Sequence, residues 1–355
     1  MDIIDLTAGH QHERVVLCRD ASSGLRAVIA VHTTRLGPAL GGTRCMPYPS
    51  EEAAVEDALE LSRAMTHKNA IALLPHGGGK AVIMADPATE KSPARLDAFA
   101  VFLHSLAGQY IAACDVGTAP ADMQRISHTT PYVTGRPAEH GGADDSGELT
   151  AFGVFQAMLA CAEHTWNSAD LSGRTVGVTG LGKVGRRLVG HLRQAGAKVV
   201  ATDVLPQARA QLQSRHPDVT LVEDDDAVLA AGLDIYAPCA LGGAISAERA
   251  ATIEARVICG AANRQLQESG LDHVLHERGI LYAPDFMVNA GGVIQIADEL
   301  KHFDAERARA HTQRIRTTTR EVLAESAGTG QTPHHVALDL AERIVARGPA
   351  TQTVR

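Results

Sequence analysis

The chain has 355 residues, of which 45% are hydrophobic, and this length and composition predict two packed domains. Lysine and arginine number 33 against 41 aspartates and glutamates, so the formal net charge is −8. Without any basic block, this balance argues against binding to nucleic acid or to an anionic membrane surface. No stretch approaches the ~18 apolar residues of a membrane span, and the first residues lack the pattern of a signal peptide.

Cysteine and histidine usage predicts a cytoplasmic protein without a metal. The six cysteines are widely spaced and include no C-x-x-C pair, which is typical of reduced thiols rather than of a disulfide framework or a zinc site. Two histidine pairs, His10 with His12 and His334 with His335, lack further ligands nearby in the sequence. We therefore expect solvated histidines at both places and no metal.

The first third of the chain alternates predicted strands with predicted helices. The expected strands span residues 14–18, 25–32, 71–74, 81–84 and 110–114. A helix from Ser50 to about Lys68 carries two acids in its first turn, where the helix dipole favours them, and a second helix spans 92–106. Lys68 closes the apolar stripe of the first helix, so it is either a functional cation or a lysine that snorkels at a helix end.

Two charged residues of this region are candidates for chemistry. Lys80 follows three consecutive glycines at 77–79 in a chain whose positive charge is mostly arginine. Glycine lets backbone approach a ligand closely, and a lysine held in such a pinched, partly buried place can lose its proton near neutral pH. The alternative is a β-turn with a surface lysine. Asp115 stands at the end of the strand predicted at 110–114, where α/β proteins place ligand contacts.

A polar, glycine-rich stretch at residues 136–148 is the expected linker or hinge. A helix at about 150–164 follows it. Beyond residue 203, the main predicted elements are strands at 233–237, 256–259 and 280–283 and helices at 293–301, 305–325 and 332–346. Polar or glycine-rich loops follow these three strands, and a doubly wound α/β fold places its ligand contacts at such strand ends.

Residues 180–185 have the spacing G-x-G-x-x-G. A predicted strand at 175–179 precedes them, a helix that ends near Gly196 follows, and a second strand at 198–203 ends in an acid. This order is typical of a dinucleotide-binding unit, in which the glycines let a pyrophosphate approach the helix N-terminus. The predicted cofactor contacts are Gly180, Leu181, Gly182, Lys183, Val184, Gly185 and Asp203.

The acid favours NAD over NADP as the cofactor. Asp203 can accept hydrogen bonds from ribose hydroxyls and would repel a 2′-phosphate, and residues 204–207 hold no cation that could receive one. An ordinary βαβ unit with a glycine-rich turn is the alternative to a cofactor site.

Five segments in order resemble one family over nearly the whole chain. They are residues 36–44, 65–70, 77–80, 115–118 and 283–292, and they are similar to the amino-acid dehydrogenases of the glutamate, leucine, phenylalanine and valine type. The stretches 149–155 and 280–300 look most like the valine dehydrogenases of actinomycetes, with leucine dehydrogenase second.

The resemblance implies an α/β protein of two domains with a cleft between them. An N-terminal α/β substrate and oligomerisation domain would span 1–140, and a C-terminal Rossmann NAD-binding domain would span 149–330. Helices at about 331–355 would pack back on the first domain or the hinge. The family also implies a homo-oligomer, from dimer to octamer.

The family reaction is the reversible oxidative deamination of an L-amino acid by NAD to a 2-oxo acid, ammonium and NADH. The resemblance makes Lys80 the catalytic lysine, Asp115 the acid/base for the amine and Lys68 the cation for the substrate carboxylate. Repulsion by Lys68 and partial desolvation would lower the pKa of Lys80 toward that of a general base. The remaining implied contacts are Gly41 and Asn289 for the carboxylate and Thr150 and Asn263 for the nicotinamide and its ribose.

The implied side-chain pocket consists of Leu40, Ala113, Val293 and Ile296. All four are aliphatic, so a substrate with a second carboxylate would be left unpaired there, and a branched aliphatic amino acid is expected. Ile296 stands where leucine dehydrogenases carry a valine, which narrows the pocket and favours valine as the substrate.

Other functions remain possible, and the sequence differs from the branched-chain enzymes near two of the predicted site segments. The alternatives are a leucine or aromatic amino-acid dehydrogenase, or a catalytically inactive NAD-binding regulatory protein on the same fold. Two places depart from the branched-chain enzymes. The segment Leu74-Pro75-His76 stands where they usually have an acid and a leucine, and Arg264 stands where they usually have an asparagine. We expect His76 to influence the titration of Lys80.

Overall fold

The computed structural model describes residues 11–348, in which the chain forms two compact units. The first unit contains the described residues before Gly147, the segment Val293–Ala305 and the described residues from Ala341 onward. The second contains Gly147–Gly292 and Glu306–Leu340. His10 lies outside the described residues, as do the first ten residues and the last seven.

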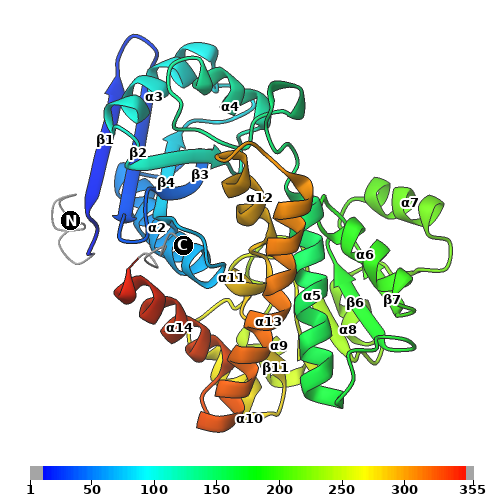
Figure 1. Cartoon of the computed structure of the whole chain (residues 1–355). Helices are drawn as coiled ribbons and strands as arrows, with labels where there is room; N and C mark the ends of the chain where they lie inside the picture. The colour runs from blue at the N-terminus through cyan, green and yellow to red at the C-terminus, as the bar shows by residue number, and fades with distance from the viewer. Residues whose placement is uncertain (1–10, 349–355) are drawn as a thin grey trace. The chain divides into compact units, whose positions relative to one another are not determined.

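A five-stranded mixed sheet organises the first unit (Figure 1). Its strands lie in the order β1 (Arg14–Asp20), β2 (Leu25–Thr33), β4 (Gly77–Met84), β3 (Ala39–Met46) and β5 (Tyr110–Cys114). The pairs β1–β2 and β2–β4 are antiparallel, and β3 pairs in parallel with both β4 and β5. The carboxyl ends of β3, β4 and β5 therefore meet at one edge of the sheet.

Helices cover both faces of this sheet because strand residues point alternately to each side. Val28 and Ala30 pack with Val55 and Leu59 of α2 (Glu51–Ile71). Their neighbours Ala27, Ile29 and Val31 belong to the opposite core, with α3 (Pro93–Ser105) and α4 (Pro120–Ser127). The α2 helix begins as expected, because the side chain of Ser50 accepts a hydrogen bond from the Ala53 N–H.

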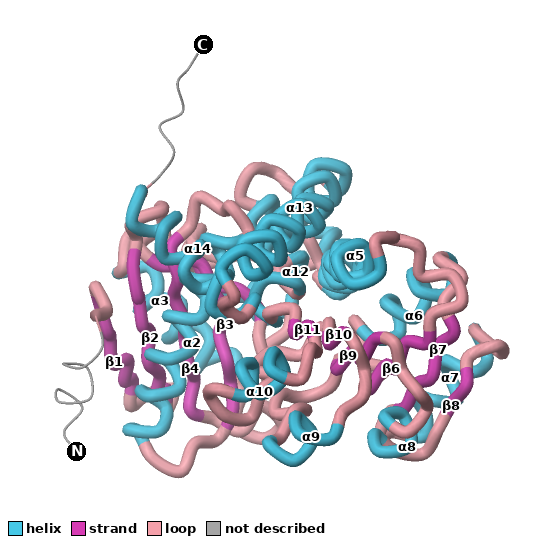
Figure 2. Tube along the Cα trace, turned by 90° about the horizontal axis from the view of Figure 1, so that it is seen from below, coloured by secondary structure: helices cyan, strands magenta, loops and turns pink. Residues whose placement is uncertain are grey.

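The second unit is built on a six-stranded sheet, coloured magenta with the other strands in Figure 2. The order is β8 (Thr220–Leu221), β7 (Lys198–Thr202), β6 (Thr175–Thr179), β9 (Ile235–Pro238), β10 (Val257–Ile258) and β11 (Leu281–Tyr282). Every pairing is parallel. This order is the doubly wound Rossmann arrangement, and its direction reverses between β6 and β9.

Five helices agree with the helices predicted from the sequence to within a few residues at each end. They are α5 (Gly147–Trp166), α6 (Gly185–Gln194), α12 (Gly291–Glu299), α13 (Ala305–Thr329) and α14 (Pro333–Arg347). Shorter helices without a prediction are α7 (Pro206–Arg215), α8 (Asp225–Leu229), α9 (Ala247–Thr252), α10 (Leu271–Glu277), α11 (Asp285–Val288) and the 3₁₀ turn η1 (Ala138–His140).

The strand predicted at 71–74 is wrong. Helix α2 runs on through Ile71, and Leu73 adopts a left-handed backbone conformation with φ of 56°. The glycines at 77–79 are part of β4 rather than a turn before it. These strand positions are glycines because α2 packs closely on β4, and a Cβ at Gly78 would lie 2.2 Å from the backbone nitrogen of Thr66 on α2.

A buried glutamate fixes the stretch that was expected to be a linker. Glu299, at the end of α12, accepts hydrogen bonds from the N–H groups of Gly135 (2.7 Å) and Ala143 (2.9 Å). Its other oxygen accepts one from Nε of Arg136 at 2.9 Å. The Glu299 side chain is only 2% exposed, so three donors satisfy a charge that would otherwise be costly to bury.

Three composition-based expectations concern groups that the structure describes. All six cysteines are free thiols. Between residues 11 and 348, no helix is long and apolar enough to cross a membrane, and no three metal-binding side chains gather at one place. His334 packs against the rings of Tyr282 and Phe286, and His335 faces Asp339 at 3.5 Å.

Candidate active site

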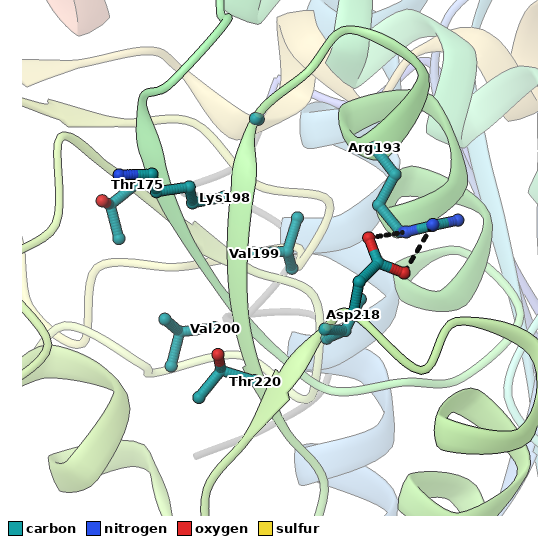
Figure 3. A pocket seen from close by; sticks show the side chains of 9 residues that line it. Thr175, Arg193, Lys198, Val199, Val200, Asp218 and Thr220 are labelled. Atoms are coloured by element: carbon teal, nitrogen blue, oxygen red, sulfur yellow. Dashed lines mark hydrogen bonds and ion pairs between the residues drawn. The ribbon is translucent and has the colours of Figure 1, made fainter.

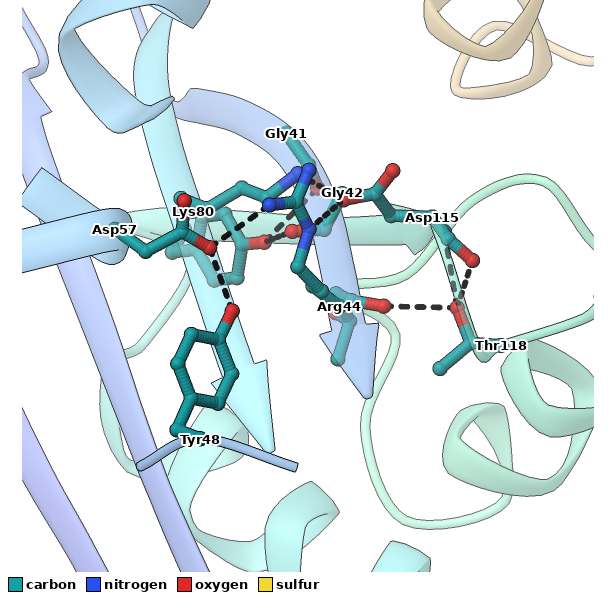
Figure 4. A network of polar contacts seen from close by, with 10 residues as sticks. Gly41, Gly42, Arg44, Tyr48, Asp57, Lys80, Asp115 and Thr118 are labelled. Atoms are coloured by element: carbon teal, nitrogen blue, oxygen red, sulfur yellow. Dashed lines mark hydrogen bonds and ion pairs between the residues drawn. The ribbon is translucent and has the colours of Figure 1, made fainter. Parts of the chain in front are cut away.

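Lys80 and Asp115 form an ion pair in the first unit (Figure 4). Lys80 lies in the middle of β4 and is 5% exposed, and Asp115 directly follows β5. Sequence positions 35 residues apart thus meet because β3 lies between these strands and pairs with both. The structure brings the two predicted catalytic residues together, with the ammonium of Lys80 on the Oδ2 atom of the carboxylate.

A network that the sequence did not reveal surrounds this pair. Arg44 on β3 donates a hydrogen bond from Nε to Oδ2 of Asp115 at 3.2 Å and another from Nη1 to Oδ2 of Asp57 at 2.8 Å. Tyr48 donates its hydroxyl proton to the same Asp57 oxygen at 2.5 Å. One sequence feature could have indicated that Arg44 belongs to the site. Arg44 is two residues after Gly42 on β3, so both residues are on the face of the strand near Asp115.

Burial and neighbouring charges shift the titration of the pair. Burial lowers the pKa of Lys80, and the charge of Arg44 adds to this effect, while the carboxylate of Asp115 opposes it without reversing it. Burial by itself would raise the pKa of Asp115, but the ammonium of Lys80 and the guanidinium of Arg44 outweigh it and hold that pKa below its usual value. Both shifts favour a readily deprotonated amine beside an ionised carboxylate.

His76 is not among the main influences on the pKa of Lys80. Its Nδ1 lies 3.1 Å from the carbonyl of Pro38, and burial lowers its pKa. The main charges that act on Lys80 come from Asp115, Arg44 and Asp57. Arg264 has a left-handed backbone with φ of 50°, a conformation that asparagine adopts more easily than arginine does.

The predicted substrate contacts of the first unit surround β3 and β4. Lys68 is half-buried near the end of α2, and the adjacent Asn69 donates hydrogen bonds to the carbonyls of Leu40 (3.0 Å) and Gly77 (2.6 Å). These bonds hold the end of α2 against both strands. Gly41 lies so close to β4 that a Cβ there would come within 1.8 Å of the Gly79 carbonyl oxygen.

The four predicted pocket residues are all in the first unit. Leu40 is fully buried, and Ala113 and Val293 are 1% and 6% exposed. Ile296 is held through its carbonyl, which accepts a hydrogen bond from Thr134 at 2.6 Å. A Cβ built on Gly135 would contact both Cys114 and Ile296 at 3.7 Å, so Ile296 lies near the end of β5 that carries Ala113.

The second unit contains the predicted cofactor loop at the carboxyl end of β6. Gly180 has a φ of 93°, and a Cβ at Gly185 would lie 1.9 Å from the Gly180 carbonyl oxygen, so neither position accepts a larger residue without strain. Asp203 accepts hydrogen bonds from the N–H groups of Leu181 (2.6 Å) and Leu205 (2.8 Å). The acid and the glycine loop thus meet as the fingerprint predicts, and the loop geometry fits a bound dinucleotide.

The second unit also contains the predicted substrate contact Asn289 and the predicted cofactor contacts Thr150 and Asn263. Asn289 donates to the side-chain oxygen of Asn263 at 2.8 Å and to the carbonyl of Ala261 at 3.1 Å, so these two amides lie together. Thr150 is in the first turn of α5. The sequence showed no cation at 204–207, but the structure places Arg209 on the carbonyl of Asp203 at 2.9 Å.

A pocket of about 310 Å³ lies elsewhere in the second unit (Figure 3). Thr175 and Lys198, the first residues of β6 and β7, are among its lining residues. Its arginine, Arg193, already pairs with Asp218 at 2.5 Å. Because the pocket is at the amino ends of these strands, it is opposite the edge of the sheet where the glycine loop lies, and no predicted site residue lines it.

Known protein families match both units. Residues 153–231 match the "D-isomer specific 2-hydroxyacid dehydrogenase, NAD binding domain". Residues 12–132 match the "Glu/Leu/Phe/Val dehydrogenase, dimerisation domain", and residues 206–343 match "Glutamate/Leucine/Phenylalanine/Valine dehydrogenase". With the Rossmann sheet and its glycine loop, these matches define the class as an NAD-dependent dehydrogenase.

Full-length relatives narrow the class. The valine dehydrogenase of Streptomyces virginiae is 54% identical over 94% of this chain and 93% of its own length. The leucine dehydrogenase of Geobacillus stearothermophilus is 43% identical over 96% and 92%. Among solved structures, L-tryptophan dehydrogenase from Nostoc punctiforme superposes with a TM-score of 0.84 at 37% identity and covers 97% of this chain and 98% of its own. The chain belongs to the Glu/Leu/Phe/Val dehydrogenase family, which confirms the predicted family, enzyme class and cofactor.

Proposed function

We propose that the protein catalyses the reversible, NAD-dependent oxidative deamination of a branched-chain aliphatic L-amino acid, with valine preferred. The observation that carries this proposal is the buried ion pair between Lys80, in the middle of β4, and Asp115, which directly follows the carboxyl end of β5. A lysine with a lowered pKa beside an ionised carboxylate is suited to activate water and to exchange protons with an amine. The similarity to valine dehydrogenases of Streptomyces supports the substrate class.

We assign substrate binding and the proton transfers to four side chains and one backbone group of this chain. Lys68 holds the substrate carboxylate, assisted by the backbone of Gly41 and by Asn289. Lys80 in its neutral form takes a proton from the water that attacks the imine carbon, and Asp115 takes and returns the protons of the amine nitrogen. Bound NAD supplies the acceptor for the hydride that leaves Cα, and the glycine loop and Asp203 are the residues that would hold it.

The pocket supports an aliphatic side chain. Leu40, Ala113, Val293 and Ile296 offer no polar atom to a second carboxylate or a hydroxyl, which would be left without a partner. Ile296 narrows the pocket relative to valine at that position, and this difference of one methylene favours valine by ~1–3 kcal/mol at most. Leucine and aromatic amino acids are the alternative substrates, and relatives that act on leucine and on L-tryptophan are similar enough to make them worth testing.

The organisation of the chain follows from the same comparison. We assign the substrate to the N-terminal domain at 1–140 and NAD to the domain at 149–330, and we expect the C-terminal helical segment after residue 330 to pack on the first domain or the hinge. The last expectation is supported by Ala341, which packs with Leu36 and Ala70. The match of 12–132 to a dimerisation domain supports a homo-oligomer, and six free thiols suit the reducing cytoplasm.

Initial rates of NADH formation with a panel of L-amino acids test the proposal. Valine should give the highest kcat/KM, followed by leucine, and glutamate should give almost none. A catalytically inactive NAD-binding protein would form no NADH with any of them, and a maximum with phenylalanine or tryptophan would move the protein to the aromatic branch.

A further inference from the structure

We propose that Arg44 is a positioning residue for Asp115. Its guanidinium and the ammonium of Lys80 both hold the Oδ2 atom of the carboxylate, so that the Oδ1 atom is left to exchange protons with the substrate amine. This inference rests on the proposed function, because it concerns the carboxylate that serves the amine.

The contacts leave the two oxygens of Asp115 in different situations. Oδ2 receives the ammonium of Lys80 and the Nε–H of Arg44. Among residues 11–348, no side chain donates a hydrogen bond to Oδ1, and the Asp115 side chain remains 23% exposed. Figure 4 shows both cations on the same side of the carboxylate. Both cations therefore lie on Oδ2, and the backbone N–H of Val116 is a further donor that lowers the pKa of the carboxylate. Oδ1, which no side chain of the described residues occupies, is the oxygen left to a ligand.

Arg44 is itself fixed by a second carboxylate. Its Nη1 donates to Asp57 at 2.8 Å, and the hydroxyl of Tyr48 holds the same Asp57 oxygen. The side chains of Arg44 and Asp57 are 21% and 16% exposed, so water competes little for these bonds. The planar guanidinium fork has one donor for each carboxylate, which the single ammonium of a lysine cannot reproduce with the same geometry.

This arrangement ties Asp115 to the helix that carries the predicted carboxylate-binding cation. Asp57 and Lys68 both belong to α2, about three helical turns apart, and that spacing puts them on the same side of the helix. Arg44 joins Asp57 to Asp115 across the end of the sheet. Arg44 therefore sets the position of the Asp115 carboxylate relative to Lys68, which we expect to bind the substrate carboxylate.

Arg44 also acts on the titration of both catalytic groups. The groups that face the pair are Arg44 from β3, Asp57 from α2 and Tyr48 from the loop after β3. Burial is the largest influence on both Lys80 and Asp115, and the charge of Arg44 lowers the pKa of each. Removal of this charge would let both pKa values rise, and oxidative deamination, which needs neutral Lys80, would then require a higher pH.

The test compares Arg44→Met, Arg44→Lys and Asp57→Asn with the parent. For Arg44→Met we expect kcat with valine to fall roughly 10²-fold, as for a displaced catalytic group, with a smaller change in KM. The acidic limb of the pH–rate profile should move to higher pH. Arg44→Lys keeps the charge, so its acidic limb should stay near that of the parent while kcat remains reduced. Asp57→Asn keeps Arg44, so its acidic limb should not rise.

Carbon-13 NMR titration of aspartate carboxyls gives a readout independent of turnover. The Asp115 resonance is assigned by its loss in Asp115→Asn, and Arg44→Met should raise its pKa. The matched control is Arg125→Met, which removes an ion pair of 2.6 Å to Asp97 in the same unit and should change neither the Asp115 titration nor the pH profile. An Arg44→Met protein with an unmoved Asp115 titration, or with reduced kcat at an unshifted pH profile, would overturn the proposal.

The outcomes for the two proposals are separable. A parent protein that oxidises no L-amino acid would refute the proposed function, and the NMR titration would still decide whether Arg44 controls Asp115. If Arg44→Met does not fold, Arg44→Lys decides the question, because parental kcat in that variant would show that the fork is not needed.

Discussion

A Cβ atom at Gly42 would lie 2.7 Å from the Cβ of Asp115. Real Cβ atoms do not approach each other so closely, so a side chain at position 42 must displace the carboxylate or the strand that carries it. The glycine is required by a residue that lies 73 positions later in the chain. The glycine in segment 36–44 is therefore needed to make room for Asp115, which belongs to segment 115–118.

Gly42→Ala should therefore damage activity more than stability. The methyl group pushes on Asp115, which is the partner of Lys80, and a shift of about 1 Å in a catalytic group can cost ~10²-fold in rate. Initial rates with valine and the thermal midpoint Tm measure the two effects. The control is Gly190→Ala, since a Cβ at Gly190 meets no atom within 4 Å and alanine improves the helix α6 by about 1 kcal/mol. Full activity in Gly42→Ala would contradict the close contact.

Lys80→Ala should abolish deamination and leave NADH binding intact, because the cofactor loop belongs to the other unit. The loss of a general base should reduce kcat by at least ~10²–10⁴-fold. Steady-state rates and fluorescence titration with NADH measure the two properties. Lys198→Ala serves as the control, since that lysine is exposed at the amino end of β7. Turnover of Lys80→Ala within a few-fold of the parent would exclude Lys80 as the base.

Asp203→Ser combined with Val204→Arg should raise the use of NADP relative to NAD. The change removes the repulsion of a 2′-phosphate and adds a cation beside Arg209, which already contacts the Asp203 carbonyl. Each 1.4 kcal/mol gained would change the ratio of kcat/KM values about tenfold. Val204→Arg alone retains the acid and should have the smaller effect. An unchanged NADP/NAD ratio in the double variant would argue against Asp203 as the ribose ligand.

Ala113→Gly combined with Ile296→Ala should shift preference from valine toward phenylalanine. The enlarged pocket would admit a ring without overpacking, while valine would leave a void. We expect the phenylalanine-to-valine ratio of kcat/KM values to rise roughly 10–200-fold, with the chemistry intact because Lys68 and Lys80 are unchanged. An active double variant with an unmoved ratio would show that other residues form the pocket.

Glu299→Gln should destabilise the first unit by about 1.5–3 kcal/mol, the value of hydrogen bonds to a charged group. The amide cannot present two acceptor oxygens to the donors of Gly135, Ala143 and Arg136. Urea unfolding followed by circular dichroism measures the change. Glu277→Gln, an exposed position at the end of α10, is the control and should change stability little. Equal unfolding midpoints for the two variants would contradict the role of Glu299.

Local stereochemistry explains which elements were predictable. The cofactor loop was readable because its strand, glycines, helix and acid follow one another within about thirty residues, a βαβ unit's length. The long helices were readable from their periodicity and capping residues. The run at 71–74 was misread because a buried helix end and a short strand have the same apolar composition.

By itself, the sequence determined the two α/β domains, the NAD loop, and Lys68, Lys80 and Asp115 as candidates. Only the tertiary structure showed that β3 lies between β4 and β5, and so that Arg44 meets Asp115 and Asp57 at once. The physical reason is range. A glycine turn or a helix cap depends on neighbours in the chain. A network of ion pairs that joins four separate elements depends instead on strand order, which long-range packing decides.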